Sequence, residues 1–352
     1  MPGNSFGKAL VLTSYGESHG AAVGGVLDGF PANLIIDLSF IQSELDRRRS
    51  GLEFFASPRL EEDKIEILSG IYNGKSTGAP IAFLIHNHDQ KPADYDHLTT
   101  VYRPSHADFT WQQKYGIRDP RGGGRSSARE TLVRVAGGAF AKLFLQTNNI
   151  QVNARISQLG GFQIQNPGFP VGDKAFATGY RVSGIEDPAI IVFLEHLKSD
   201  GDTTGGVIAC SITGVTAGLG EPVFDKLQAD LAKAMLSINS VKGFEYGSGF
   251  EGAAMKGSEH NDPFVNEGGV IKTHTNYSGG IQGGISNGEE IYFNVAFKPV
   301  STLMRDQETV TTAGEKTTLK GKGRHDVCVL PRALPIVEAM AALVIADHLI
   351  RK

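Results

Sequence analysis

The stretch Gly122-Gly123-Gly124-Arg125-Ser126-Ser127-Ala128-Arg129-Glu130-Thr131 precedes a run of apolar and small residues from Leu132 to Leu145. Three consecutive glycines allow a loop backbone to approach a ligand closely, and the residues after them have the pattern of a helix start. Ser127 and Glu130 have the capping-box spacing, which predicts that Ser127 accepts from first-turn amides while Glu130 reaches back. Amides, hydroxyls and guanidinium groups would then meet at one helix N-terminus. This arrangement predicts an anion site.

The position of Arg129 adds to this prediction. Arg129 lies at helical spacing from four residues of the apolar run: Leu132, Val133, Ala136 and Phe140. We therefore expect Arg129 to head the buried face of the helix. A buried guanidinium needs a negative partner, since an unpaired buried cation costs several kcal/mol. That partner is either a bound anion or a nearby Asp or Glu, and this stretch alone leaves both open.

Composition bounds the kind of protein. With 352 residues, 40% of them apolar, the chain is long enough for two domains or for one large layered α/β fold. A net charge of -4 argues against general binding to nucleic acid or to a membrane surface, so any polyanion site must be local. Cys210 and Cys328 are too few for a disulfide framework and lack metal-ligand spacing. We expect a cytoplasmic protein with no membrane span and no metal.

Hydrophobic patterns predict most elements. Strands are expected at 10–13, 21–27, 65–68, 79–85, 150–159, 206–213 and 291–297. Helices are expected from Ser39 as N-cap to about 49, over 132–145, within 187–202, over 225–238 and over 335–348. The last is apolar on nearly all sides and should be buried. Residues 304–323 are expected to form an exposed flap.

Two further patterns are weaker. His86 and His88 follow a strand and fall on one side of it, but two ligands without a third do not make a metal site, so we assign them no role. Strand patterns at 79 and 207, and helices at 39 and 225, recur in kind without a constant offset. A duplicated architecture is therefore only a hypothesis.

Several short segments, taken singly, read as exposed cations or loop histidines, but together they resemble the chorismate synthase family. They are Gly16-Glu17-Ser18-His19-Gly20, Asp46-Arg47-Arg48-Arg49, Arg103-Pro104-Ser105-His106-Ala107-Asp108, the stretch from Gly122 to Thr131, Gly218-Leu219-Gly220-Glu221-Pro222-Val223-Phe224-Asp225, Ser237-Ile238-Asn239 and Arg324-His325-Asp326. The matches occur in chain order from residue 3 to residue 351, so the resemblance covers the whole chain.

The resemblance implies an α+β fold, a β-α-β sandwich with helices packed between antiparallel sheets. It implies a single domain over 1–352 with long Gly-rich and flap loops, assembled as a homotetramer. The reaction it implies is the anti-1,4-elimination of phosphate from 5-enolpyruvylshikimate 3-phosphate to give chorismate, in the shikimate pathway of aromatic amino acid biosynthesis. Reduced FMN is required without net redox change, and whether NADPH reduces the flavin on the enzyme stays open.

The resemblance also implies site residues. Flavin contacts would come from Arg125, Ser126, Ser127, Asn239, Ser240, Gly283, Lys298, Pro299, Val300, Ser301, Thr302 and Arg324. Substrate anions would be bound by Arg48, Arg49, Arg103, Arg129, Arg134 and Arg332. Guanidinium groups suit this task because they bind carboxylate and phosphate bidentately.

Four catalytic residues follow from the same resemblance. His19 would act as general acid beside the departing phosphate, and His106 would protonate or stabilise the flavin near N1. Ser18 with Asp326 would form a relay that takes a proton from flavin N5.

The chain also departs from the family pattern. Residues 52–55 (Leu-Glu-Phe-Phe) separate the arginines at 47–49 from the next one, Arg59. Val327 stands where a proline commonly follows His-Asp. The first departure affects one contact to the substrate or the reductant. The second affects the geometry of its loop.

Two other classes of protein compete with this reading. A phosphate-ligand or RNA-binding protein would use the Arg121-to-Arg125 stretch, but it should show a basic face with interleaved aromatics. A kinase-like phosphoryl transferase would need a lysine after the glycines, where Arg125 stands instead. Flavin binding distinguishes the synthase from both.

Overall fold

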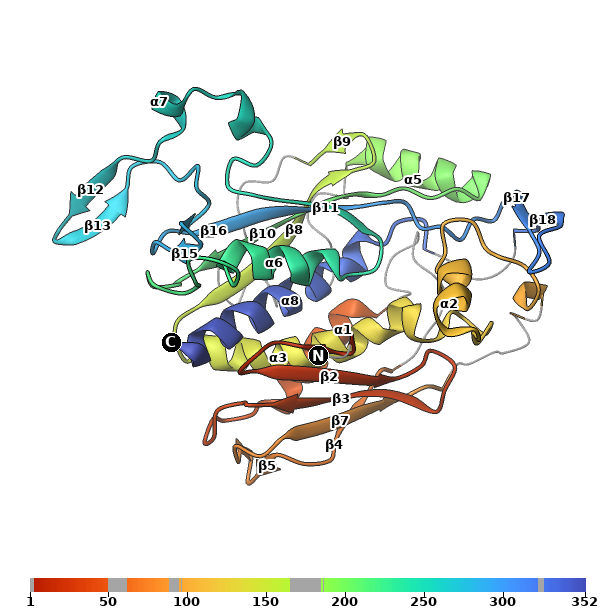
Figure 1. The fold of residues 1–352 in the computed structure, drawn as a ribbon, viewed down its shortest axis with the longest axis horizontal. Helices are drawn as coiled ribbons and strands as arrows, with labels where there is room; N and C mark the ends of the chain where they lie inside the picture. Colours follow the sequence, from red (N-terminus) through yellow and green to blue (C-terminus); the bar gives the residue numbers. More distant parts are fainter. Residues whose placement is uncertain are drawn as a thin grey trace.

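The computed structural model describes residues 3–49, 62–88, 95, 97–164, 185, 187–321 and 326–352. It shows an α+β sandwich in which helices lie between two five-stranded antiparallel sheets (Figure 1). The first sheet, in strand order, contains β1 (Ser5–Phe6), β2 (Val11–Gly16), β3 (Ala22–Asp28), β7 (Ile81–His86) and β4 (Ile65–Ile67). The second contains β11 (Val241–Tyr246), β16 (Ile291–Phe297), β10 (Gly206–Thr213), β8 (Gln151–Leu159) and β9 (Phe162–Gln163). The expected fold class is confirmed.

The middle layer is formed by four helices, α1 (Leu38–Arg48), α3 (Thr131–Gln146), α6 (Leu227–Leu236) and α8 (Leu330–Arg351). Outside it lie α2 (Asp108–Tyr115), α5 (Pro188–Asp200) and the short α7 (Gly257–His260). Three 3₁₀ turns are η2 (Gly124–Ser126), η3 (Ala128–Glu130) and η4 (Glu251–Ala254). Four hairpins complete the described elements: β5–β6 (Ile71–Tyr72, Lys75–Ser76), β12–β13 (Phe264–Glu267, Val270–Thr273), β14–β15 (Ile281–Gln282, Ile285–Ser286) and β17–β18 (Gln307–Val310, Lys316–Leu319).

Four of the five strands in each sheet have the same connectivity. In chain order the first half runs β2, β3, α1, β4, β7, α3 and the second runs β8, β10, α6, β11, β16, α8, and the strands lie in matching order in each sheet. Segments 70–83 and 280–293 share seven residues at an offset of 210 (280 − 70): Gly, Ile, Gly, Ser, Gly, Ile and Phe. The architecture is therefore duplicated, although the strand at 81–86 matches the one at 291–297 and not the one at 207.

A repeated serine explains part of this match. Ser76 donates its hydroxyl to Pro31 O (2.6 Å) and accepts from the amide of Leu34 (3.0 Å). Ser286 donates to Thr216 O (2.7 Å) and accepts from the amide of Leu219 (2.9 Å). In each half the buried hydroxyl satisfies two backbone groups and fixes the loop after the central strand of its sheet, β3 or β10.

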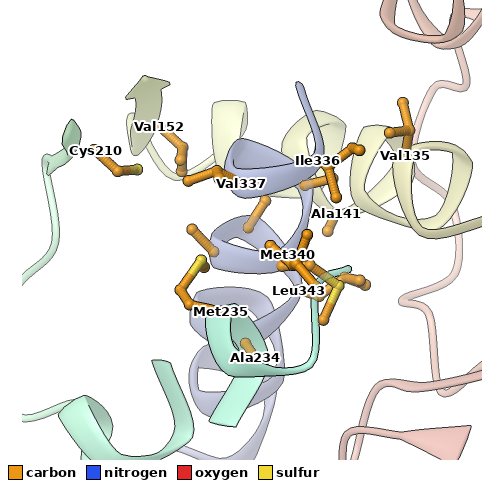
Figure 2. Packing of buried hydrophobic residues seen from close by; sticks show 14 of the residues in the cluster. Val135, Ala141, Val152, Cys210, Ala234, Met235, Ile336, Val337, Met340 and Leu343 are labelled. Atoms are coloured by element: carbon orange, nitrogen blue, oxygen red, sulfur yellow. The ribbon is translucent and has the colours of Figure 1, made fainter. Parts of the chain in front are cut away.

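The apolar, small-residue run became α3 because it packs closely against α8. A methyl group at Gly138 would collide with Ala339, so the glycine lets the two helices approach. Figure 2 shows Val337, Met340 and Leu343 of α8 packed among Val152, Cys210 and Met235 from the second sheet and α6. Within the described residues, α8 alone is long and apolar enough to cross a membrane, but 83% of its apolar window is buried in this fold. The expectation of a buried last helix is confirmed.

Several boundaries differ from the sequence prediction. The N-cap of α1 is Asp37, whose carboxylate accepts from the amides of Ser39 (2.9 Å) and Phe40 (3.1 Å), so Ser39 is not the cap. Helix α8 begins at Leu330 because a proline is tolerated in a first turn, and Pro335 lies inside it. Residues 241–246, for which the sequence predicts no element, form β11, and residues 108–115, also without a predicted element, form α2. The flap at 304–323 contains the β17–β18 hairpin.

Candidate active site

The glycine loop before α3 brings two histidines together. Gly122, Gly123 and Gly124 all have positive φ values (65°, 99° and 53°), which only glycine adopts readily in succession. A Cβ atom on Gly122 would collide with the ring of His19, and one on Gly123 would lie 3.0 Å from Cε1 of His106. The glycines therefore let two imidazole rings lie against the loop backbone, while the predicted approach to a ligand stays a prediction.

The loop that carries His19 is tied to the start of α3. Ser18 and His19 are buried, and the Ser18 hydroxyl is 3.2 Å from His19 Nδ1. Asn87, directly after β7, donates to Glu17 O (3.0 Å) and Gly20 O (2.8 Å). Its amide oxygen accepts from Nε of Arg129. One buried amide therefore fixes the histidine loop and a proposed substrate arginine together.

Three arginines lie beside each other at the α1, α3 and α8 ends. Arg48 donates to the Thr131 hydroxyl (2.8 Å) and to Ala128 O (2.7 Å), and the backbone carbonyl of Arg48 accepts from Arg332 (3.3 Å). Arg129 pairs with the buried Asp63 at 3.0 Å, and Arg48 Nη1 lies 3.9 Å from the same carboxylate. Arg332 pairs with Asp326 at 2.5 Å. The negative partner that we expected for Arg129 is thus Asp63.

Charge is not balanced in this group. Burial lowers the pKa of Arg48, the positive charge of Arg332 lowers it further, and that of Arg129 also adds to the effect. Asp63 and Asp326 act in the opposite direction without cancelling it. An arginine stays protonated in practice, and among the described residues three guanidinium groups meet two carboxylates at this buried site. Such a site favours binding of an anion.

The capping box is only half formed. Ser127 Oγ accepts from the amide of Arg129 (3.3 Å), as predicted. Glu130 does not reach back: its carboxylate accepts from the Ser14 hydroxyl (2.9 Å) and from Nε of Arg134 (2.8 Å). The prediction for Glu130 was wrong, because a hydroxyl on β2 and a guanidinium one turn along the helix are better donors than the Ser127 amide.

The segment before α2 gathers around Asp108, which is buried. Arg103 donates Nε (2.8 Å) and Nη2 (2.7 Å) to its carboxylate, and His106 Nδ1 lies 2.9 Å from Oδ1. Arg118 Nη1 lies 3.6 Å from the same oxygen. Burial opposes ionisation of Asp108, but hydrogen bonds from Arg103 and His106 outweigh it and hold its pKa well below the usual range.

The residues expected to hold flavin form a second group. Asn239 Nδ2 donates to Ser126 O (2.9 Å), and the amide of Lys298 donates to Ser240 O (2.9 Å). These contacts join the turn after α6 both to the glycine loop and to the segment after β16. Burial, and the charge of the nearby Lys242, lower the pKa of Lys298. The two lysines suit a phosphate group.

Other predicted residues lie in or beside these groups. Arg125 donates to Gly16 O (3.1 Å) and to the Ser14 hydroxyl (2.6 Å), and Arg134 donates to the Ser237 hydroxyl (2.7 Å). The segment Pro299 to Thr302 is fixed by the Thr203 hydroxyl, which donates to Val300 O (2.8 Å). The described contacts leave the pairing of Ser18 with Asp326 a prediction.

Two predicted residues lie apart from the groups described above, and a third lies outside the described residues. Gly283 lies in the β14–β15 turn next to the start of α6, whereas Asn239 follows the end of that helix. Arg49 is about one-third exposed and lies 3.6 Å from Asp46. Arg324 is outside the described residues, as are the departures at 52–55. Val327 is described and is buried.

Sequence reasoning missed three buried polar residues that hold the site, namely Asp63, Asn87 and Asp108. Each was adjacent to a quoted pattern, but its partner lies far away in the chain or across a turn. Among the described residues, no group of three or more His, Cys, Asp and Glu side chains could hold a metal ion.

Comparisons with known proteins agree in one family. The family model described as chorismate synthase matches residues 10–350. The chain is 55% identical to a chorismate synthase of Cytophaga hutchinsonii, over 99% of this chain and 98% of that protein. It is 56% identical to one of Bacteroides thetaiotaomicron, over 98% and 97%. A solved structure described as a crystal structure of chorismate synthase superposes with a TM-score of 0.75 at 30% identity, covering 98% of this chain and 93% of the other.

Proposed function

The chain belongs to the chorismate synthase family, and from that premise we propose that reduced FMN binds beside its glycine loop and that the buried arginines bind the substrate anions. The enzyme is a lyase that eliminates phosphate from 5-enolpyruvylshikimate 3-phosphate and gives chorismate. Members of this family use reduced flavin. The identity of the flavin as FMN and the residues that hold it are our proposal.

The observation that carries the substrate site is the excess positive charge around Arg48. Three arginines, Arg48, Arg129 and Arg332, meet the carboxylates of Asp63 and Asp326 at the junction of α1, α3 and α8. The substrate has one phosphate and two carboxylates. Its binding would remove the charge imbalance, and a guanidinium can offer two parallel hydrogen bonds to either kind of anion. We place Arg134 and Arg103 at the edge of this site, since carboxylates of the protein engage both.

The cofactor site is supported by its donors. Lys298 and Lys242 would hold a phosphate, while Asn239, Ser240, Ser126 and Ser127 offer amide and hydroxyl groups to polar edges of a ring. We propose that Arg125, Pro299, Val300, Ser301, Thr302 and Arg324 complete it. When bound, reduced FMN supplies electron density that helps phosphate to leave and takes it back, so no reducing equivalent is consumed.

Proton transfers fall to the two histidines at the glycine loop. His19, held by Ser18 and by the Gly122 backbone, would donate a proton to the leaving phosphate. His106 would hold a proton next to the flavin site. Ser18 and Asp326 remain our proposed relay. Ser18, His19 and Asp326 are buried, and the exclusion of water from them strengthens their electrostatic contacts.

We also propose the arrangement of the molecule. The chain would be one domain over residues 1–352, would assemble as a homotetramer and would act in the cytoplasm without nucleic-acid or membrane partners. The single cluster of buried apolar residues that spans both sheets supports the one-domain description.

The decisive experiment is an anaerobic assay of phosphate release and chorismate absorbance with oxidised or chemically reduced FMN. We expect the enzyme to turn over only when the FMN is reduced, because the elimination needs electron density that oxidised flavin lacks. Adding NADPH to the enzyme with oxidised FMN then tests whether this enzyme uses NADPH to reduce its own flavin. Absence of product from folded protein with bound reduced FMN would refute the proposed site, and equal turnover without flavin would refute the cofactor.

A further inference from the structure

We propose that Asp108 is a positioning residue that fixes the proton of neutral His106 on Nδ1 and so makes Nε2 the only atom through which His106 exchanges a proton. This inference rests on the proposed role of His106 beside the flavin, but the orientation itself can be measured without flavin.

The first step is the charge of Asp108. Its carboxylate is 4% exposed and accepts two hydrogen bonds from the side chain of Arg103 and one from the Arg103 amide (3.1 Å). Arg118 adds a second guanidinium at 3.6 Å. A carboxylate with these partners is ionised over the whole working range of the enzyme, and an ionised carboxylate can only accept hydrogen bonds.

The second step is the tautomer. His106 Nδ1 lies 2.9 Å from Asp108 Oδ1, so Nδ1 must be the donor in this contact. In the neutral ring the proton is then on Nδ1 and the lone pair on Nε2. Residual freedom of the ring is small, because the His106 amide donates to Arg103 O (3.2 Å) and closes the turn that carries both groups.

The third step is the direction of Nε2. A Cβ atom built on Gly123 would lie 3.0 Å from Cε1 and 3.3 Å from Nε2 of His106, so this edge of the ring faces the glycine loop. Ser126, which we place at the flavin, follows in that same loop and donates to Gly123 O (2.7 Å). Asp108 therefore directs the exchangeable position of His106 toward the proposed cofactor site. Arg103 acts on the same carboxylate, so its main task is to hold Asp108 in place.

The direct test is nuclear magnetic resonance of the flavin-free protein with ¹⁵N-labelled histidine, at about pH 8.5, where an ordinary imidazole is neutral. The signal of His106 is identified by its loss in His106→Gln. We expect Nδ1 of His106 to carry the proton in the wild type. In Asp108→Asn we expect the proton to move wholly or partly to Nε2, because the new amide can donate to Nδ1. Protonated Nε2 in the wild type, or an unchanged tautomer in Asp108→Asn, would overturn the proposal.

Asp119→Asn is the matched control, since Asp119 lines one pocket together with Asp108 and Gly123 but pairs with Arg121. It should leave the His106 spectrum unchanged, and a shift equal to that of Asp108→Asn would also overturn the proposal. The wild-type measurement does not depend on Asp108→Asn, so a failure of that variant to fold does not remove the test.

A kinetic measurement links the orientation to the reaction. With reduced FMN, Asp108→Asn should lower kcat by on the order of 100-fold while KM for the substrate stays within about threefold, and Asp108→Glu should recover part of kcat. A loss confined to KM would overturn the assigned role. If the tautomer is as expected but the wild type shows no flavin-dependent turnover, the orientation stands and the proposed function fails.

Discussion

At the scale of single residues, we expect a change at Arg48 to affect substrate binding much more than the stability of the fold. This side chain is 3% exposed, and among the described residues three guanidinium groups, those of Arg48, Arg129 and Arg332, meet only two carboxylates here, so a bound anion would complete the charge balance. We predict that Arg48→Gln raises KM for the substrate by on the order of 100-fold, because one charge-assisted contact of a few kcal/mol is lost. The melting temperature of the ligand-free protein should not fall by more than about 4 °C, since the mutation also removes a buried charge.

The matched control is Arg49→Gln. Arg49 is the next residue in the chain, but it is about one-third exposed and lies near Asp46. In this variant both KM for the substrate and the melting temperature should stay near the wild-type values. A large drop in melting temperature of Arg48→Gln with an unchanged KM would show that Arg48 is structural.

The residue scale also shows how far sequence reasoning reaches. Ser18, His19 and Arg129 could be singled out from residue type and from their position beside glycines or on a helix face, and the structure places them at one site. Asp63 could not, because nothing in an acidic run indicates which carboxylate will meet a guanidinium far along the chain. The hydrogen bonds from Arg103 to Asp108 could not be predicted either, because they are visible only in three dimensions, while the substrate contact of Arg103 stays a prediction.

At the scale of elements, an ionic cluster joins the three central helices. Glu338 on α8 accepts from Arg47 of α1 (2.7 and 2.9 Å), from Lys142 of α3 (2.6 Å) and from the amide of Ala154 on β8 (3.1 Å). Glu44 of α1 pairs with both cations, so two carboxylates balance two positive charges. Burial opposes ionisation of Glu338, but the charges of Arg47 and Lys142 lower its pKa to about 2.

This cluster predicts a pH dependence of stability. A carboxyl whose pKa is lowered in the folded state contributes stability that is fully present above its unfolded pKa, about 4.3, and is lost as the pH falls toward 2. Glu338→Gln should therefore destabilise the protein by about 3–5 kcal/mol at pH 7, because Lys142 and Arg47 lose a buried partner. Below about pH 4 the difference from wild type should shrink. Urea unfolding at several pH values measures it.

Glu66→Gln serves as the control for that series, since the Glu66 side chain is more than half exposed. Its unfolding curves should follow the wild type at every pH. A stability difference for Glu338→Gln that stays constant from neutral to acid pH would contradict the assignment of ionised Glu338 as the source.

Elements were predictable where local pattern and tertiary packing agree. The strands at 206–213 and 291–297 were predicted with the bounds observed, because both faces of each strand have a clear pattern. Strand β11 was missed because Gly243 and flanking polar residues resemble a helix end, and its place in the sheet comes from pairing with β16. The start of α8 was missed because Pro335 looked like a boundary, although the core accepts it inside the helix.

At the scale of the whole molecule, the duplicated architecture explains where the site lies. His19, Arg48 and Arg129 belong to the first half, whereas Asn239, Lys298 and Arg332 belong to the second. The start of α3 and the start of α8 lie at the same end of the middle layer, so both halves contribute to one site (Figure 1). This relation is hard to find in the sequence, because the matching residues lie mainly in the turns around Ser76 and Ser286. The strand patterns compared in the sequence analysis, at 79 and 207, are not equivalent strands.

The assembly is the last prediction at this scale, and the β12–β13 hairpin supports it. The hairpin projects from the body of the molecule (Figure 1) and exposes Phe264, Val270 and Ile271. A two-stranded hairpin is marginally stable alone, and grouped exposed apolar residues indicate a protein contact. We predict that light scattering gives a mass of about 150 kDa, four times the 37.6 kDa of one chain. The double change Phe264→Ser with Ile271→Ser should lower that mass.

Val310→Ser is the control for this experiment, because Val310 is an exposed apolar residue on the separate β17–β18 hairpin. It should leave the mass unchanged. A wild-type mass of a single chain would refute the tetramer, while an unchanged mass of the double variant would show that copies meet elsewhere. The arginines and histidines that we place in the site all belong to one chain. A dissociated variant that keeps these groups in place should therefore still bind the substrate. Loss of substrate binding together with loss of mass would mean that a second copy completes the site.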